Sequence, residues 1–152
     1  MKQIGTTEFF ELGDKTALIC GDQNTIEKLT LKDLGFKFHV AETQELGIEQ
    51  IRYTQYDCII VHENFSGSSL RSNAVLHYLA SVPMAQRRYS FVCLIGNSFK
   101  TLDAMEAFAN SVQLVLNPAD LPNLGAILKK SLAEFEILYR PYKDAVAALG
   151  EK

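Results

Sequence analysis

The sequence lacks the features that mark three common classes of protein. A net charge of −3 over 152 residues gives no electrostatic reason for a nucleic-acid partner. No apolar run approaches the ~20 residues of a membrane-spanning helix. The N-terminal stretch MKQIGTTEFFELGDK has one apolar pair, which Glu11, Gly13 and Asp14 follow, unlike a secretory signal peptide. We therefore expect a cytoplasmic protein with no nucleic-acid partner and no membrane association.

Cysteine is scarce, and its spacing excludes a familiar metal site. Cys20, Cys58 and Cys93 lie far apart, each inside an apolar run, and the chain has no CxxC motif. The three histidines are not spaced for zinc binding either. The sequence thus predicts three buried thiols that act as small hydrophobic residues, and no metal site.

What the chain does have is an alternation of apolar runs with segments of helical periodicity. The runs predict five strands, at 16–20, 36–41, 56–65, 89–95 and 112–116. The periodic segments predict five helices, at 24–35, 45–53, 70–81, 101–109 and from about 121 onward. Strands that alternate with helices indicate a three-layer α/β sandwich around a parallel sheet.

The first of these helices has recognisable boundary signals. Asn24 can cap its N-terminus, with Glu27 three residues on as the partner in a capping box. Gly35 is typical of a helix end. The first fourteen residues lie outside the alternation, and an arm, an extra strand or a linker remains open for them. We expect one domain at 15–138 and an extension of the last helix at 139–152.

The order of elements resembles the receiver domains of response regulators, from about residue 15 to residue 138. Tyr56-Asp57 precedes the third strand, as Tyr-Asp often does in that family, and Asn117-Pro118 ends the fifth strand where the family usually has Lys-Pro. The resemblance implies a flavodoxin-like sheet of order 2-1-3-4-5. It also implies a role in two-component signal transduction.

The same resemblance implies where phosphoryl transfer would occur, and this chain differs at most of those positions. The family has an acidic pair after the first strand, where this chain has Gly21-Asp22. The acceptor aspartate of the third strand corresponds to His62. Gly96 stands in place of a Thr or Ser, and Asn117 in place of a Lys.

These departures change the chemistry that the strand ends offer. Asp22 beside an imidazole is a poor magnesium site, because Mg²⁺ requires several oxygen ligands in octahedral geometry. Without the metal and the lysine, little positive charge remains for a phosphoryl group. We therefore expect a pseudo-receiver that is no enzyme, needs no cofactor and is not phosphorylated on aspartate.

His62 has three possible roles on the sequence alone. It can be a polar residue at a strand end bonded to Asp22, a pH-sensitive or ligand-contacting group, or a phosphate-accepting histidine. Its neighbour Glu63 is a poor replacement for an acceptor, because strand alternation turns it to the other side.

The last helix is longer than a receiver domain needs, and Pro141 predicts a kink or break in it. Apolar residues recur along it at helical spacing. The tail either folds back on its own domain or forms an interface for a protein partner or a second copy. The candidate interface residues are Phe135, Leu138, Tyr139, Tyr142, Val146 and Leu149.

The sequence favours a non-catalytic signalling domain that acts by protein–protein interaction. The alternative is a flavodoxin-like domain that binds a small molecule or nucleotide in the crevice at the C-terminal ends of the strands. Against it, the turn Gly21-Asp22-Gln23-Asn24 is a poor phosphate loop, and the chain has no GxGxxG motif.

Overall fold

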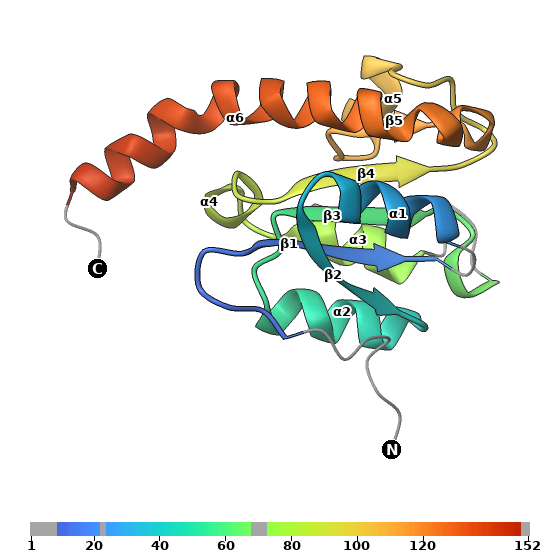
Figure 1. Cartoon of the computed structure of the whole chain (residues 1–152), viewed down its shortest axis with the longest axis horizontal. Coiled ribbons are helices and arrows are strands. Elements are labelled where there is room, and N and C mark those ends of the chain that lie inside the picture. Colours follow the sequence, from blue (N-terminus) through green and yellow to red (C-terminus); the bar gives the residue numbers. More distant parts are fainter. Residues whose placement is uncertain (1–8, 22–23, 68–72, 150–152) are drawn as a thin grey trace.

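Five parallel strands form the central sheet of the computed structural model, which describes residues 9–21, 24–67 and 73–149. Their order is β2-β1-β3-β4-β5, as the resemblance implied. The strands are β1 (Lys15–Cys20), β2 (Phe36–Ala41), β3 (Cys58–His62), β4 (Phe91–Ile95) and β5 (Leu114–Leu116). Because all are parallel, their C-terminal ends share one edge of the sheet and their N-terminal ends share the other (Figure 1).

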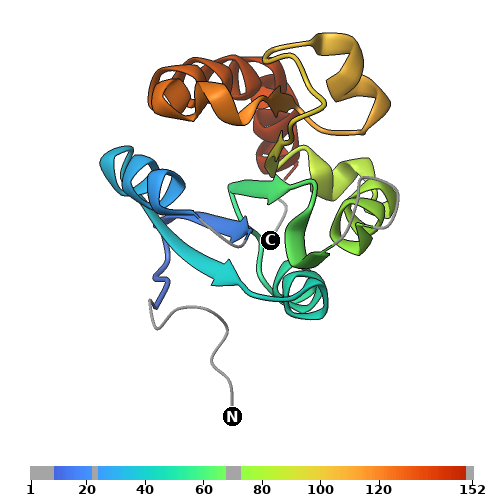
Figure 2. The same ribbon diagram turned by 90° about the vertical axis from the view of Figure 1, so that its right-hand side faces the viewer.

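Helices cover both faces of this sheet and give the predicted three layers. The α-helices are α1 (Thr25–Asp33), α2 (Gln44–Tyr53), α3 (Ala74–Ser81), α4 (Met84–Arg87), α5 (Ala104–Ala109) and α6 (Leu124–Ala148). Two 3₁₀ helices, η1 (Phe65–Gly67) and η2 (Pro118–Asn123), follow β3 and β5. Helices α1 and α6 lie on one face, and α2 and α3 lie on the other (Figure 2).

The strand period of two divides the core into two apolar clusters, one on each face. In β1, Ala17 and Ile19 point to the cluster that contains Leu124 and Leu128 of α6. The alternate residues Leu18 and Cys20 point to the cluster under α2 and α3. Strands buried on both faces read as continuous apolar runs, which is why the sequence identified them.

Several helix ends follow the expected local chemistry. The side chains of Thr43, Asn73 and Asp103 accept hydrogen bonds from backbone N–H groups at the starts of α2, α3 and α5. Gly35 ends α1 with φ of +89°, a conformation that favours glycine. Asn24 was wrongly predicted as a capping side chain, because α1 has no side-chain cap hydrogen bond.

Two predicted boundaries moved because the chain turns more tightly than periodicity shows. The helix predicted at 101–109 begins only at Ala104, since Leu102 has φ of +68° and cannot continue a helix. Ser111, with φ of +59°, likewise forms the turn before β5 and shortens that strand at its start. The short helix α4 follows Pro83 in a segment that was predicted only as a basic stretch.

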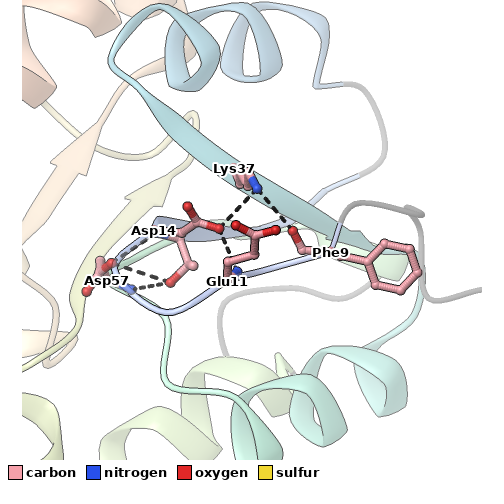
Figure 3. Close-up of polar contacts among 6 residues, drawn as sticks. Phe9, Glu11, Asp14, Lys37 and Asp57 are labelled. Atoms are coloured by element: carbon pink, nitrogen blue, oxygen red, sulfur yellow. Dashed lines mark hydrogen bonds and ion pairs between the residues drawn. The ribbon is translucent and has the colours of Figure 1, made fainter.

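Residues 9–14 contain no strand and pack along β2 (Figure 3). Lys37 Nζ donates a hydrogen bond to the Phe9 carbonyl at 3.3 Å and lies 3.1 Å from Asp14 Oδ2. The Asp14 carboxylate also accepts a hydrogen bond from the Glu11 backbone N–H at 2.6 Å. Phe10 stacks on the His39 ring, with centroids 4.0 Å apart. The segment thereby covers part of the edge strand.

Helix α6 is continuous from Leu124 to Ala148, so the break predicted at Pro141 does not occur. Figure 1 shows that its C-terminal half instead bends and extends beyond the sheet. A proline removes one backbone hydrogen bond, which bends a helix without ending it when the neighbouring turns hold. Within the described residues, none of the helices combines the length and apolar character needed to cross a membrane.

Candidate functional site

Three of the four predicted site residues lie at the C-terminal edge of the sheet. His62 is the last residue of β3 and pairs in register with Ile95 at the end of β4. Gly96 and Asn117 directly follow β4 and β5. The fourth residue, Asp22, lies outside the described residues.

The imidazole of His62 fills the space beside Gly21, the residue that follows β1. A Cβ atom at position 21 would lie 2.3 Å from Cδ2 and 2.9 Å from Nε2 of the His62 ring. Contacts this short do not occur, so any other residue at position 21 would displace the ring. The glycine at 21 and the histidine at 62 therefore form one complementary arrangement.

Glu27, in the first turn of α1, is the acidic partner of His62. Its Oε2 atom forms an ion pair with Nε2 of His62. The Glu27 side chain is 1% exposed, and that of His62 is 22% exposed. A buried carboxylate needs a positively charged or hydrogen-bonding partner. The imidazole supplies this partner, with its Nε2 carrying the proton as this geometry assigns it.

This ion pair corrects the role predicted for Glu27. The capping box required Glu27 to turn back toward Asn24, but its carboxylate faces the end of β3. Asn24 instead donates from Nδ2 to the Gly21 carbonyl at 3.2 Å. Both side chains of the predicted box thus hold the strand ends together.

Asn73 is a further site residue that sequence reasoning did not identify. Its side chain is fully buried, and Nδ2 donates to the carbonyls of His62 at 3.1 Å and Glu63 at 3.3 Å. Its Oδ1 atom accepts from the backbone N–H of Leu76 at 3.1 Å. One amide thus ties the end of β3 to the start of α3. The only sequence signal was an asparagine within a predicted helix.

Glu63 occupies the space beside Gly96 in the same way that His62 occupies the space beside Gly21. A Cβ atom at position 96 would lie 2.4 Å from the Glu63 carboxyl carbon. The Glu63 side chain is buried, and its Oε1 accepts a hydrogen bond from Ser98 Oγ at 3.1 Å. Alternation does turn Glu63 away from its neighbour, as expected, but it brings the carboxylate into the adjoining strand end.

Asn117 uses its side chain to shape the loops around it. Nδ2 donates to the carbonyls of Phe99 at 2.9 Å and Asn97 at 3.3 Å, and Oδ1 accepts from the Ala119 N–H at 2.9 Å. Its backbone N–H donates to Thr101 Oγ1 at 2.9 Å. The side chain therefore fixes the turn into η2 and adds no positive charge to the strand ends.

A hollow of about 270 Å³ remains beside these residues. Its lining residues are His62, Glu63, Asn64, Phe65, Ile95, Gly96, Asn97 and Pro118. No lysine or arginine is among them, and within residues 9–21, 24–67 and 73–149 no three His, Cys, Asp or Glu side chains are grouped to hold a metal ion. Since Glu27 is already paired with His62, the described side chains do not fit Mg²⁺.

The three cysteines are free thiols buried in the core, as the sequence predicted. Burial raises the pKa of Cys20 and of Cys58 to about 12 and the pKa of Cys93 well above its usual value of 9.0. Because the thiolate is the reactive form, these residues are inert packing groups at neutral pH.

The six candidate interface residues of α6 separate into covered and exposed groups. Phe135 is buried and packs edge-on against Phe91, with ring centroids 5.4 Å apart, so it belongs to the core. Tyr139 is half-buried against Phe135, with ring centroids 5.1 Å apart. Leu138 and Leu149 are exposed.

Tyr142 belongs to the covered group, although α6 has already passed the end of the sheet there. Its ring lies 6.3 Å from that of Tyr89, and the guanidinium carbon of Arg88 lies 4.4 Å from its centroid. Val146 is half-buried. The tail therefore partly folds back on its own domain and still leaves apolar side chains in solvent.

Solved structures similar to this one are receiver domains. A putative response regulator from Chloroflexus aurantiacus superposes with a TM-score of 0.62 at 18% identity, over 79% of this chain and 98% of that chain. A CheY-like receiver domain from Methanospirillum hungatei gives a TM-score of 0.61 at 15% identity, over 82% and 98% of the two chains.

The receiver domain of the sensor histidine kinase PA1611 from Pseudomonas aeruginosa gives a TM-score of 0.60 at 14% identity, over 80% and 99%. Its structure has a magnesium ion coordinated in the active-site cleft. No protein-family model and no curated protein sequence matches this chain. The chain therefore has the CheY-like, flavodoxin-type fold of response-regulator receiver domains.

Proposed function

We propose that this chain is a cytoplasmic receiver-like signalling module that is not phosphorylated on aspartate. It has no catalytic activity of its own and acts by binding a protein, either another chain or a second copy of itself. The receiver fold supports a regulatory role. The specific observation behind the proposal is that the protein's own side chains occupy the strand ends.

The ion pair between His62 and Glu27 is the centre of that observation. It places an imidazole beside Gly21 and uses a buried carboxylate to hold it there. A phosphoryl group needs cations around its oxygens, yet neither lysine nor arginine lines the adjoining hollow. The edge of the sheet is thus arranged as a closed structural contact.

Beryllofluoride with Mg²⁺, and separately acetyl phosphate with Mg²⁺, test this part of the proposal. We expect no change in intact mass and no saturable NMR shift of the Gly96 and Ser98 amides. A catalytically active receiver domain treated in the same buffers is the positive control. A stoichiometric, saturable adduct at the strand ends would contradict the proposal.

The groove between α5 and α6 supports the interaction part of the proposal. It has a volume of about 300 Å³, with Leu102 and Leu138 on its rim and Phe135 on its floor. Met105 and Phe108 of α5 are also exposed, at 77% and 84%. Apolar side chains gathered on one surface are typical of a protein interface.

Light scattering on the full chain tests this surface. A homodimer would give a mass above the 17.0 kDa of one chain, and Leu138→Glu and Phe108→Glu should each return it to the monomer mass. Leu29→Glu is the matched control, because Leu29 is exposed on α1. A monomeric wild type removes the homodimer and leaves a separate protein as the partner. Association unaffected by the two α5–α6 variants would exclude this surface.

The hollow beside His62 is the observation that favours a second candidate, a small-molecule site in the crevice. Its lining has one carboxylate and no lysine or arginine, so a neutral or cationic ligand suits it better than a nucleotide. A thermal-shift screen of neutral, cationic and nucleotide ligands, repeated on Glu63→Gln, separates this candidate from the first. Stabilisation that the variant loses would favour ligand binding.

A further inference from the structure

A second hollow lies at the N-terminal ends of β3 and β4, the edge of the sheet opposite His62. It has a volume of about 230 Å³ and lies among the end of α2, the middle of α3 and the short helix α4. Its lining residues are Ile51, Arg52, Tyr53, Thr54, Gln55, Tyr56, Ile59, Tyr78, Leu79, Val82, Gln86, Arg87, Ser90 and Val92.

The charge of this lining is one-sided. Arg52 and Arg87 are its charged residues, and no aspartate or glutamate is among the fourteen. Neither arginine forms an ion pair within the part of the chain that the structure describes. In a chain with a net charge of −3, two arginines on one hollow without acidic partners mark a local site for negative charge.

Both guanidinium groups are partly positioned by the protein itself. Arg87 Nη2 donates a hydrogen bond to the Ser111 carbonyl at 2.6 Å, and its side chain is half-buried. The guanidinium carbon of Arg52 lies 5.9 Å from the centroid of the Tyr78 ring. A guanidinium has five N–H donors, so each group keeps donors for a ligand. Prior positioning lowers the entropic cost of binding an anion.

The inner part of the hollow is apolar. Ile59, Leu79 and Val92 are buried core residues that reach its lining. The hydroxyl of Ser90 is already used, because it donates to the Tyr56 carbonyl at 2.6 Å and accepts from Gln55 Nε2 at 2.9 Å. A ligand that enters would therefore meet cations outside and hydrocarbon inside.

We propose that this hollow binds a small organic anion. A carboxylate or phosphate group would pair with Arg52 and Arg87, and a compact apolar body would lie over Ile59, Leu79 and Val92. The planar guanidinium matches both anions through two parallel hydrogen bonds. The volume is below the roughly 300–1,000 Å³ of drug-sized pockets, which excludes a dinucleotide and favours a ligand with one ring or a short branched chain.

Titration of the full chain with benzoate, phenyl phosphate and isovalerate, followed by NMR, tests the proposal. We expect at least one of the three to bind saturably, with shifts at the Ile59, Leu79 and Val92 methyl groups. Benzyl alcohol has the ring without the charge and should not bind, and inorganic phosphate has the charge without the apolar body and should bind more weakly. Binding should also weaken as salt is added.

Two arginine variants and one matched control identify the site. Arg52→Gln and Arg87→Gln should each weaken binding about tenfold, the loss of one charge-assisted hydrogen bond. Arg88→Gln should leave binding unchanged, because Arg88 is next to Arg87 in sequence but packs on Tyr142 outside the hollow. Arg52→Lys should retain part of the affinity, and it covers the case in which Arg87→Gln fails to fold.

Several results would overturn the proposal. These are no saturable binding of any of the three anions up to about 10 mM, well above the millimolar Kd of a weak ligand, equal binding of benzyl alcohol, and equal weakening by Arg88→Gln. Shifts confined to residues outside the hollow would also overturn it.

Discussion

The two edges of the sheet differ in what occupies them. At the C-terminal edge, His62 lies beside Gly21 and Glu63 lies beside Gly96, so the protein's own side chains take the space. At the N-terminal edge, two arginines line a hollow with no acidic residue. One edge has its charges paired internally, and the other leaves positive charge available.

This difference shows why a fold does not by itself locate a binding site. In open α/β sheets ligands generally bind outside the C-terminal ends of the strands. That position depends on side chains as well as on the sheet, and here His62 and Glu63 replace the groups that would face a ligand. Function resides in the side chains that a fold presents, so each edge must be judged on its own residues.

The largest effect that we expect comes from opening the closed edge at His62. His62→Ala leaves the buried Glu27 carboxylate without its cation and should lower the free energy of unfolding by about 3 kcal/mol. This is the lower end of the range for a broken buried pair, because the imidazole is 22% exposed. Urea denaturation of both proteins at neutral pH measures the difference.

The control for this variant is the same substitution in a Glu27→Gln background. There the neutral amide needs no cation, and His62→Ala should cost much less. An equal loss in the two backgrounds would mean that His62 stabilises the edge through packing alone. The closed edge would then owe nothing to the ion pair.

The second expected effect comes from Gly96→Ala. The new methyl group would lie 2.4 Å from the Glu63 carboxyl carbon, and overpacking of this kind costs about 1–3 kcal/mol. Glu63→Ala should recover most of that loss, as a double-mutant cycle measured by urea denaturation would show.

A matched glycine is available for comparison in α6. A Cβ at Gly125 meets only a Thr30 methyl at 3.9 Å, so Gly125→Ala should be neutral or stabilising by up to about 1 kcal/mol. Similar losses at positions 96 and 125 would contradict the close packing inferred for the C-terminal edge.

The sheet could be predicted from the sequence because burial on both faces leaves a direct trace in it. The prediction of β2 matched the structure at both ends, and Gly35 was identified as the residue that ends α1. The turns at Leu102 and Ser111 could not be predicted, because residues with positive φ are rare and carry no periodic signal.

The closed edge could be predicted only in part. The residue types His62, Gly96 and Asn117 showed that the usual chemistry would be difficult there. The pairing with Glu27 could not be predicted, because Glu27 is 35 residues away in sequence and a local capping role explained it equally well. A side chain's choice between a local and a distant partner is decided by the tertiary fold.

A smaller effect is expected at the open edge. Arg52→Gln removes an exposed side chain with no ion pair within the described part of the chain, so only its contact with the Tyr78 ring is lost. That should cost at most about 0.5–1 kcal/mol, measured by urea denaturation without ligand. A larger loss would make Arg52 a structural residue and would weaken the contrast between the edges.

The smallest effect concerns Lys37, a cation near the open edge that does have an acidic partner. A hydrogen bond from the Glu11 backbone N–H, followed by the contact with Lys37, lowers the pKa of Asp14 below its usual value of 3.8. A carboxyl whose pKa is lowered by folding stabilises the native state above its unfolded pKa and loses that contribution as pH falls through its folded pKa. The stability difference between wild type and Asp14→Asn should thus be present at neutral pH and vanish in acid. Urea midpoints between about pH 7 and pH 2 check this, and a difference that persists in acid would mean that Asp14 acts through its shape and not its charge.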